Sequence, residues 1–135
     1  MVADISNWED MRSKPVAILG GGVSGQGVQK LLNRLNWKSK IFDEKGVPLN
    51  YSRLKNCSIV VTSPGFSPDH PWIQLVRQMD LLLLSEMDFA AYFLPQPPLA
   101  ITGTNGKTTL SSLISHVYNK LGEKSVLAGN MGYSL

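Results

Sequence analysis

The feature that most constrains the fold is a unit that occurs twice: a short apolar run, a glycine-rich loop and a segment of helical periodicity. The first unit begins with "VAIL" at 16–19 and continues through "GGGVSG" at 20–25. Its helical segment repeats apolar residues at spacings of three and four, at Val28, Leu31, Leu32 and Leu35. An apolar run that leads into such a loop is typical of a buried parallel strand. The unit therefore predicts a strand, a loop and a helix of a parallel sheet.

More apolar runs follow between loops rich in glycine or proline. They predict three further strands, at 39–43, 58–62 and 81–84. Helices are expected from Trp72 to about Met79 and from Ser85, whose hydroxyl suits an N-cap. Because strands and helices alternate throughout, the predicted fold class is α/β, with a parallel sheet covered by helices.

A proline-rich connector, "LPQPP" at 94–98, divides the chain. Residues 1–94 are expected to form one complete domain, and residues 95–135 to open a second. In the second domain the pattern predicts a strand at 99–102, a phosphate-binding loop, a helix and another strand at 125–129. Gly122 is well placed as the residue that ends the helix.

Composition excludes several classes of protein. Thirteen Lys and Arg against ten Asp and Glu give a net charge of +3, and no basic run indicates nucleic acid or an anionic membrane. The single cysteine, Cys57, excludes an intramolecular disulfide and is expected to be a small buried residue. The acidic start does not resemble a signal peptide, and no apolar run is long enough to span a bilayer. We therefore expect a cytoplasmic protein.

The second loop carries the pattern Gly-x-x-Gly-Lys-Thr-Thr between a predicted strand and a predicted helix. Gly103, Asn105 and Gly106 tolerate positive φ, so that successive N–H groups can turn toward a phosphate. Lys107 would reach the β- and γ-phosphates of ATP, and the Thr108 hydroxyl would bind Mg²⁺. Ile101 stands where the generic P-loop has its first glycine. The predicted ATP-binding residues are Gly103, Thr104, Asn105, Gly106, Lys107, Thr108 and Thr109.

The stretch "AITGTNGKTT" at 100–109 resembles the ATP-binding loop of the Mur ligases, the cytoplasmic amide ligases of peptidoglycan synthesis. The loop of that family also lacks the generic first glycine. The resemblance implies an ATP-dependent ligase that requires Mg²⁺, and it makes Lys107 the catalytic residue. It also implies that residues 1–94 form a Rossmann-like domain that binds a UDP-sugar.

The first loop carries Gly20-x-Gly22-x-x-Gly25, and Asp43 follows the next predicted strand. By itself this pattern indicates a dinucleotide such as NAD. The resemblance instead assigns the loop to the UDP pyrophosphate and Asp43 to the uridine end. The residues that it implies for UDP-sugar binding are Gly22, Val23, Ser24, Gly25, Asp43, Ser63, Pro64, Gly65 and Asn130.

Two details refine this resemblance. The Ser-Pro-Gly segment at 63–65 is similar to the branch of the family that adds D-glutamate to UDP-N-acetylmuramoyl-L-alanine. Glu44 and Lys45 depart from the family, where a hydroxyl residue and an arginine often follow the acid. The uracil contacts are therefore less well indicated than those to the pyrophosphate.

The resemblance covers about residues 14–135 and implies a reaction through an acyl phosphate. ATP phosphorylates the L-alanyl carboxylate, and the amine of D-glutamate attacks it. Because family members have three domains, we expect this chain to be an N-terminal fragment that is inactive alone. Three alternatives stay open: another Mur-type ligase, a NAD-dependent oxidoreductase, and a non-catalytic nucleotide-binding module.

Overall fold

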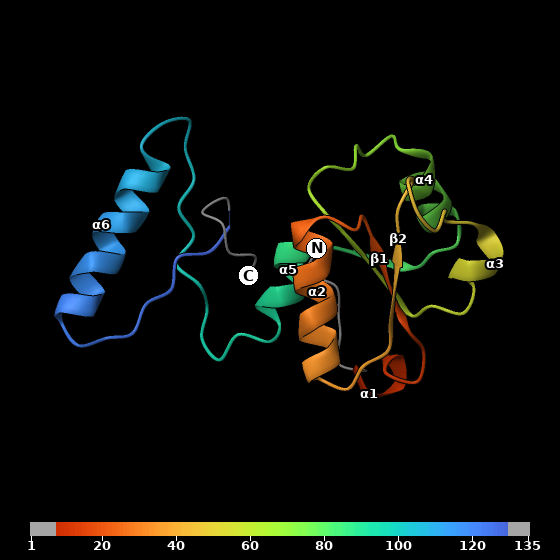
Figure 1. Ribbon diagram of the computed structural model, residues 1–135, viewed down its shortest axis with the longest axis horizontal. Helices are drawn as coiled ribbons and strands as arrows, with labels where there is room; N and C mark the ends of the chain where they lie inside the picture. Colours follow the sequence, from red (N-terminus) through yellow and green to blue (C-terminus); the bar gives the residue numbers. More distant parts are fainter. Residues whose placement is uncertain (1–7, 130–135) are drawn as a thin grey trace. The chain divides into compact units, whose positions relative to one another are not determined.

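The computed structural model describes residues 8–129 and divides the chain into two compact units, with the boundary between Tyr92 and Phe93. The elements of the first unit are α1 (Trp8–Met11), β1 (Val16–Leu19), α2 (Val23–Arg34), β2 (Ser39–Phe42), α3 (Tyr51–Leu54), β3 (Ile59–Thr62), α4 (Pro71–Gln78), β4 (Leu82–Ser85) and α5 (Glu86–Ala91) (Figure 1). The second unit contains α6 (Lys107–Lys120). The alternation of strands and helices matches the prediction for the first unit.

The first unit is built on a four-stranded sheet in which every strand is parallel to its neighbours. The strand order is β2-β1-β3-β4, and Leu19 at the end of β1 pairs with Phe42 on one side and Thr62 on the other. The predicted α/β class is confirmed. From β1 the chain moves to one edge and then crosses back to β3, so the order of strands reverses beside β1. In open α/β sheets such a reversal places a crevice at the carboxyl ends of the strands.

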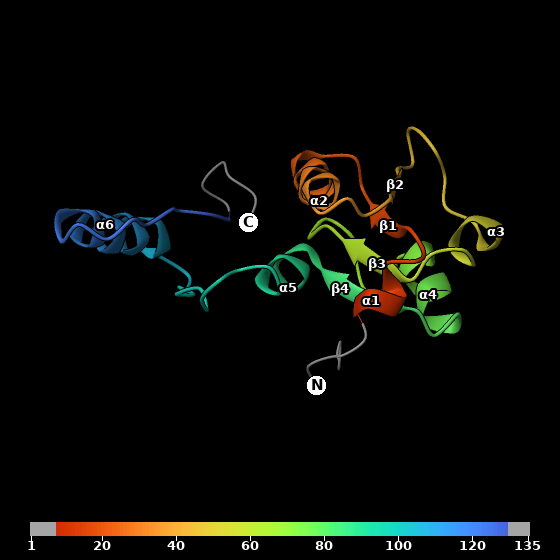
Figure 2. The same ribbon diagram turned by 90° about the horizontal axis from the view of Figure 1, so that it is seen from below.

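Helices cover both faces of this sheet. Figure 2 shows α2 and α5 on one side and α3 and α4 on the other. The side chains of β1 alternate between the faces, and all four are buried. Buried residues on the α3 and α4 side form one apolar cluster, which comprises Ala17, Leu19, Phe42, Leu49, Leu54, Cys57, Val60, Ile73 and Val76. Right-handed crossovers explain the two layers, because connections toward opposite edges place their helices on opposite faces.

The two strands predicted for the second unit are wrong. Residues 99–102 and 125–129 are assigned to no strand, and Leu99 and Val126 are 67% and 84% exposed. Their apolar character indicated buried strands, but a strand exists only where a neighbour completes its hydrogen-bond ladder. No ladder pairs either segment among residues 8–129.

Two local predictions are confirmed. Ser85 caps α5, since its Oγ accepts a hydrogen bond of 3.1 Å from the Asp88 N–H. Gly122 has a φ of +84° just after α6. The N–H groups of Gly122 and Glu123 donate to carbonyls of the last helical turn, at 3.2 and 3.0 Å, which is a Schellman ending.

The short helices α1 and α3 were not anticipated, because four residues are too few to show a helical period. Among residues 8–129, no helix combines the length and the apolar character needed to cross a bilayer.

Candidate functional site

The turn after β1 is held in a tight conformation at the carboxyl edge of the sheet. Gly20 has a φ of +95°, and its N–H donates to the carbonyl oxygen of Phe42 at 2.8 Å. A Cβ placed on Gly25 would lie 1.9 Å from the carbonyl oxygen of Gly20, so only glycine allows α2 to start this close to the strand. Gly22 is the N-cap of α2 and makes no side-chain cap. The first N–H groups of α2 are therefore suited to an anion.

Asp43 connects the end of β2 to this glycine turn. Its Oδ2 accepts a hydrogen bond of 2.7 Å from the Gly21 N–H, and its Oδ1 accepts one of 3.0 Å from the Lys45 N–H. These two hydrogen bonds lower the pKa of the Asp43 carboxyl below its ordinary value, because they stabilise the charged form. Asp43 was predicted as a ligand contact; the structure shows two backbone N–H groups of the protein as its hydrogen-bond partners.

The segment after β3 closes the same edge. The Ser63 N–H donates to the carbonyl of Leu19 at 3.4 Å, and a Cβ on Gly20 would lie 2.9 Å from Ser63 Oγ. Pro64 and Gly65 are exposed. The structure thus brings together three loops that are far apart in sequence, at the reversal of strand order between β1 and β3.

The predicted site residues of α2 lie at the same edge. Val23 is exposed, Ser24 is half-buried and Gly25 is buried against the turn. Asn130, the remaining residue of the predicted UDP-sugar site, lies outside the described residues.

The sequence did not lead us to expect that His70 contributes to this edge of the sheet. Its Nε2 lies 3.0 Å from Glu44 Oε1, and its Nδ1 accepts a hydrogen bond of 3.1 Å from the Trp72 N–H. His70 is thereby the N-cap of α4, with Pro71 in the first turn. The signal was present in the sequence, because proline favours the first helical position and the residue before it is then the cap.

The loop before α6 is shaped by two glycines. Gly103 and Gly106 have φ values of +149° and +76°, and Gly106 is the N-cap of α6 without a side-chain cap. Asn105, which could tolerate the same conformation, is not among the described residues with positive φ. The positive φ at Gly106 explains the glycine, since a side chain there would be strained.

Lys107 lies back across this loop. Its Nζ donates to the carbonyl oxygen of Gly103 and, at 3.4 Å, to that of Thr104. The ammonium is thus held over the loop by carbonyls that a phosphate oxygen could replace as its partners. Thr108 and Thr109 follow in the exposed first turn of α6.

A metal ion would find few ligands here. Within the described part of the chain, no group of three or more His, Cys, Asp or Glu could hold one. The Thr108 hydroxyl fits Mg²⁺, which usually keeps several waters and binds phosphate oxygens in addition to one or two protein ligands.

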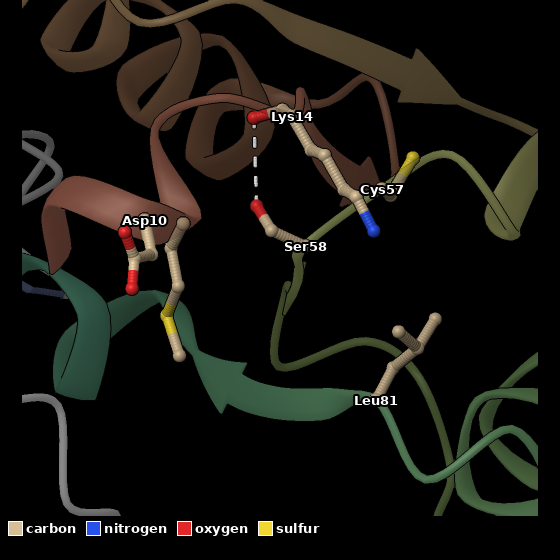
Figure 3. A pocket seen from close by; sticks show the side chains of 6 residues that line it. Asp10, Lys14, Cys57, Ser58 and Leu81 are labelled. Carbon is tan, nitrogen blue, oxygen red and sulfur yellow. Dashed lines mark hydrogen bonds between the residues drawn. The ribbon is translucent and has the colours of Figure 1, made fainter. Parts of the chain in front are cut away.

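A hollow of about 330 Å³ lies elsewhere on the first unit and is lined by Asp10, Met11, Lys14, Cys57, Ser58 and Leu81 (Figure 3). Several of these residues precede β1, β3 and β4, so the hollow lies at the amino ends of the strands, away from the glycine turn. Ser58 Oγ donates to the Lys14 carbonyl at 3.4 Å across it. Cys57 is buried as predicted, and burial raises the pKa of its thiol, which disfavours the reactive thiolate.

Comparison with known proteins finds relatives that all carry one name. No protein-family model matches the chain. The chain is 35% identical over 146 residues to "UDP-N-acetylmuramoylalanine--D-glutamate ligase" of Thermoanaerobacter pseudethanolicus. The aligned region covers 93% of this chain and 32% of the relative. Proteins of the same name from Christiangramia forsetii and Prochlorococcus marinus are each 32% identical, over 90% and 87% of this chain. The chain spans about a third of the length of the curated relatives it matches.

Proposed function

Since this chain is a relative of the Mur ligases named UDP-N-acetylmuramoylalanine--D-glutamate ligase, we propose that it supplies the nucleotide-binding loops of that enzyme. In the proposed reaction, ATP phosphorylates the carboxylate of UDP-N-acetylmuramoyl-L-alanine, and ADP leaves. The amine of D-glutamate then attacks the acyl phosphate, so that an amide forms and inorganic phosphate is released. The observation that carries the proposal is the presence of two differently built glycine loops in a chain that matches these ligases over about nine-tenths of its residues.

The first unit is proposed to bind the UDP-sugar. The glycine turn at 20–25 and the unpaired N–H groups at the start of α2 would receive the pyrophosphate. Asp43 has lone pairs beyond those used by Gly21 and Lys45, and these could accept hydrogen bonds from the uridine end. The 63–65 segment would border the same ligand.

The second unit is proposed to bind ATP. Lys107 would exchange its contacts to the carbonyls of Gly103 and Thr104 for contacts to the β- and γ-phosphates. Its charge would stabilise the phosphoryl group as it transfers, which is the main work of catalysis in this class of reaction. When bound, Mg²⁺ would neutralise phosphate charge, with the Thr108 hydroxyl as a ligand. A cytoplasmic location follows from the proposal, because ATP and UDP-sugars are used there.

Calorimetry on the 135-residue chain tests the first part of the proposal. We expect UDP and UDP-N-acetylmuramoyl-L-alanine to bind, and NAD to bind more weakly or not at all. Uridine monophosphate is the matched control ligand, because it lacks the second phosphate that the glycine turn would hold. Tight binding of NAD without binding of UDP would contradict the proposal and favour an oxidoreductase.

A further inference from the structure

The loops that follow β2 and β3 contact each other directly, although their strands are not neighbours. Glu44 Oε1 lies 3.0 Å from His70 Nε2. Because β1 separates β2 from β3 in the sheet, this contact bridges the carboxyl end of β1. It therefore lies beside the glycine turn that begins at Gly20.

The second ring nitrogen of His70 defines the tautomer. Nδ1 accepts a hydrogen bond from the Trp72 N–H, so it carries no proton. In the neutral ring the proton then resides on Nε2, which donates it to Glu44. The contact is thus a directed hydrogen bond, and its geometry is set by the cap of α4.

Phe66 connects His70 to the glycine turn. The Phe66 and His70 rings meet edge to face, with centroids 4.8 Å apart. A Cβ placed on Gly20 would lie 3.2 Å from Cε2 of Phe66, so this ring packs directly on the turn.

Asp43 completes the connection from the other side. It precedes Glu44 and accepts the hydrogen bond of 2.7 Å from the Gly21 N–H. Together with the peptide bond between Asp43 and Glu44, these contacts form a closed series that starts and ends at the turn. The members of this ring of contacts are Gly20, Gly21, Asp43, Glu44, His70 and Phe66.

We infer that Glu44 and His70 form a latch, a positioning pair that fixes the 63–70 segment beside the glycine turn and thereby tightens the binding of a nucleoside diphosphate. The inference rests on the proposed function, because it takes the UDP group as the ligand of this edge. A loop already held in place loses less conformational freedom when the ligand binds. Glu44 is 68% exposed and His70 21%, so water screens the pair and its contribution is modest.

Three substitutions isolate the latch. His70→Asn keeps a good N-cap for α4 but is too short to reach Glu44. Glu44→Ala removes the acceptor, whereas Glu44→Gln keeps an acceptor oxygen for the Nε2–H. By calorimetry with UDP, we expect His70→Asn and Glu44→Ala each to weaken binding about two- to fivefold, the range of partly exposed pairs. Glu44→Gln should bind like the unmodified chain.

The double variant and a matched control complete the test. His70→Asn combined with Glu44→Ala should bind no more weakly than His70→Asn alone, because His70→Asn already removes the one interaction with Glu44 that Glu44→Ala removes. Asp69→Asn removes an exposed acid from the same segment without touching the latch and should not change the affinity. Unchanged affinity in both single variants, or effects that add in the double variant, would overturn the inference.

Nitrogen-15 NMR of the His70 ring separates the latch from the proposed function. We expect a proton on Nε2 and a chemical shift that changes in Glu44→Ala but not in Asp69→Asn. A proton on Nδ1, or a ring insensitive to Glu44→Ala, would show that the latch does not form. If the unmodified chain fails to bind UDP while the ring behaves as expected, the proposed function is wrong and the role of the latch in UDP binding falls with it.

Discussion

The two glycine loops of this chain achieve their shapes in different ways. The turn after β1 is enclosed by contacts from the loops after β2 and β3, and a side chain at Gly25 would collide with the backbone. The loop before α6 is held by the ammonium of its own Lys107, and a Cβ at Gly106 would meet nothing within 4 Å. A similar motif can thus be built by tertiary packing in one unit and by local contacts in another.

The helices that follow the two loops differ in the same way. Both carry apolar residues at helical spacing, but Val28 and Leu32 of α2 are buried against the sheet. None of the described side chains of α6 is buried, and Leu113 is 58% exposed. The periodicity shows which face of a helix can be buried, and the presence of a partner decides whether it is.

Substitutions in α2 and α6 test the difference in burial between the two helices and should change stability most. Leu32→Ala should lower the free energy of unfolding by about 2–5 kcal/mol, because it leaves a cavity in the core. Leu113→Ala on α6 should change it by less than about 0.5 kcal/mol. Urea unfolding followed by far-ultraviolet circular dichroism, which detects the loss of helix in both units, measures both substitutions. Equal effects of the two substitutions would show that the two helices do not differ in packing.

Glycine substitutions test how far the turn after β1 depends on close packing of the backbone. Gly25→Ala should destabilise the first unit by about 3 kcal/mol, since its Cβ would lie 1.9 Å from a backbone oxygen that cannot move away cheaply. Gly22→Ala is the control, because Gly22 has a φ of −71° and open space around it. The same urea titration measures both. A well-folded Gly25→Ala chain with unchanged stability would contradict the close approach of α2 to β1.

Under the proposed function, a change at Lys107 should affect catalysis at the second loop and leave binding at the first loop intact. In a hybrid of this chain with the rest of the Thermoanaerobacter relative, Lys107→Ala should lower kcat by about a hundredfold or more, because it removes charge from the transferring phosphoryl group. Lys107→Arg should not restore the rate, since a planar guanidinium cannot replace a compact ammonium in a tight loop.

Affinity for the UDP-sugar, measured by calorimetry on the same variant, should stay unchanged. Lys120→Ala, at the other end of α6, is the control for loss of an exposed lysine. A parallel loss of UDP-sugar affinity and kcat would show that the two loops serve one ligand.

Asp43→Ala tests the contact between the loop after β2 and the glycine turn. Asp43→Ala should weaken UDP binding roughly tenfold, as expected for a charged acceptor. The pKa of Asp43 is lowered in the folded state, so its charged form stabilises the fold at pH values above the ordinary aspartate pKa. This contribution is lost as the pH falls through the lowered pKa.

The unmodified chain should therefore have a higher free energy of unfolding than the Asp43→Ala variant at neutral pH, and this difference should shrink below about pH 4. Urea unfolding across this pH range measures it, with Asp69→Ala as the control. A difference that grows toward acid pH would contradict the hydrogen bonds assigned to Asp43.

Much of the first unit could be predicted from the sequence. The apolar runs predicted all four strands to within about a residue, because buried parallel strands need unbroken apolar residues between polar loops. Ser85 and Gly122 were predicted as helix ends, because a cap depends on contacts within a few residues of the chain. The relation to the Mur ligases was also predicted from short motifs, and the relatives confirm it.

The remaining features depend on how distant parts of the chain pack together. Residues 99–102 have the apolar character of a strand, yet they form none, because ladder hydrogen bonds require a partner strand that no local pattern specifies. The contact between Glu44 and His70 likewise depends on the strand order that places their loops on either side of β1. The strands of the first unit, the helix ends at Ser85 and Gly122 and the two glycine-loop patterns could be read from the sequence, since these depend on neighbouring residues. The order of the strands decided which distant residues meet at the carboxyl edge of the sheet, because that order arises only when the chain packs on itself.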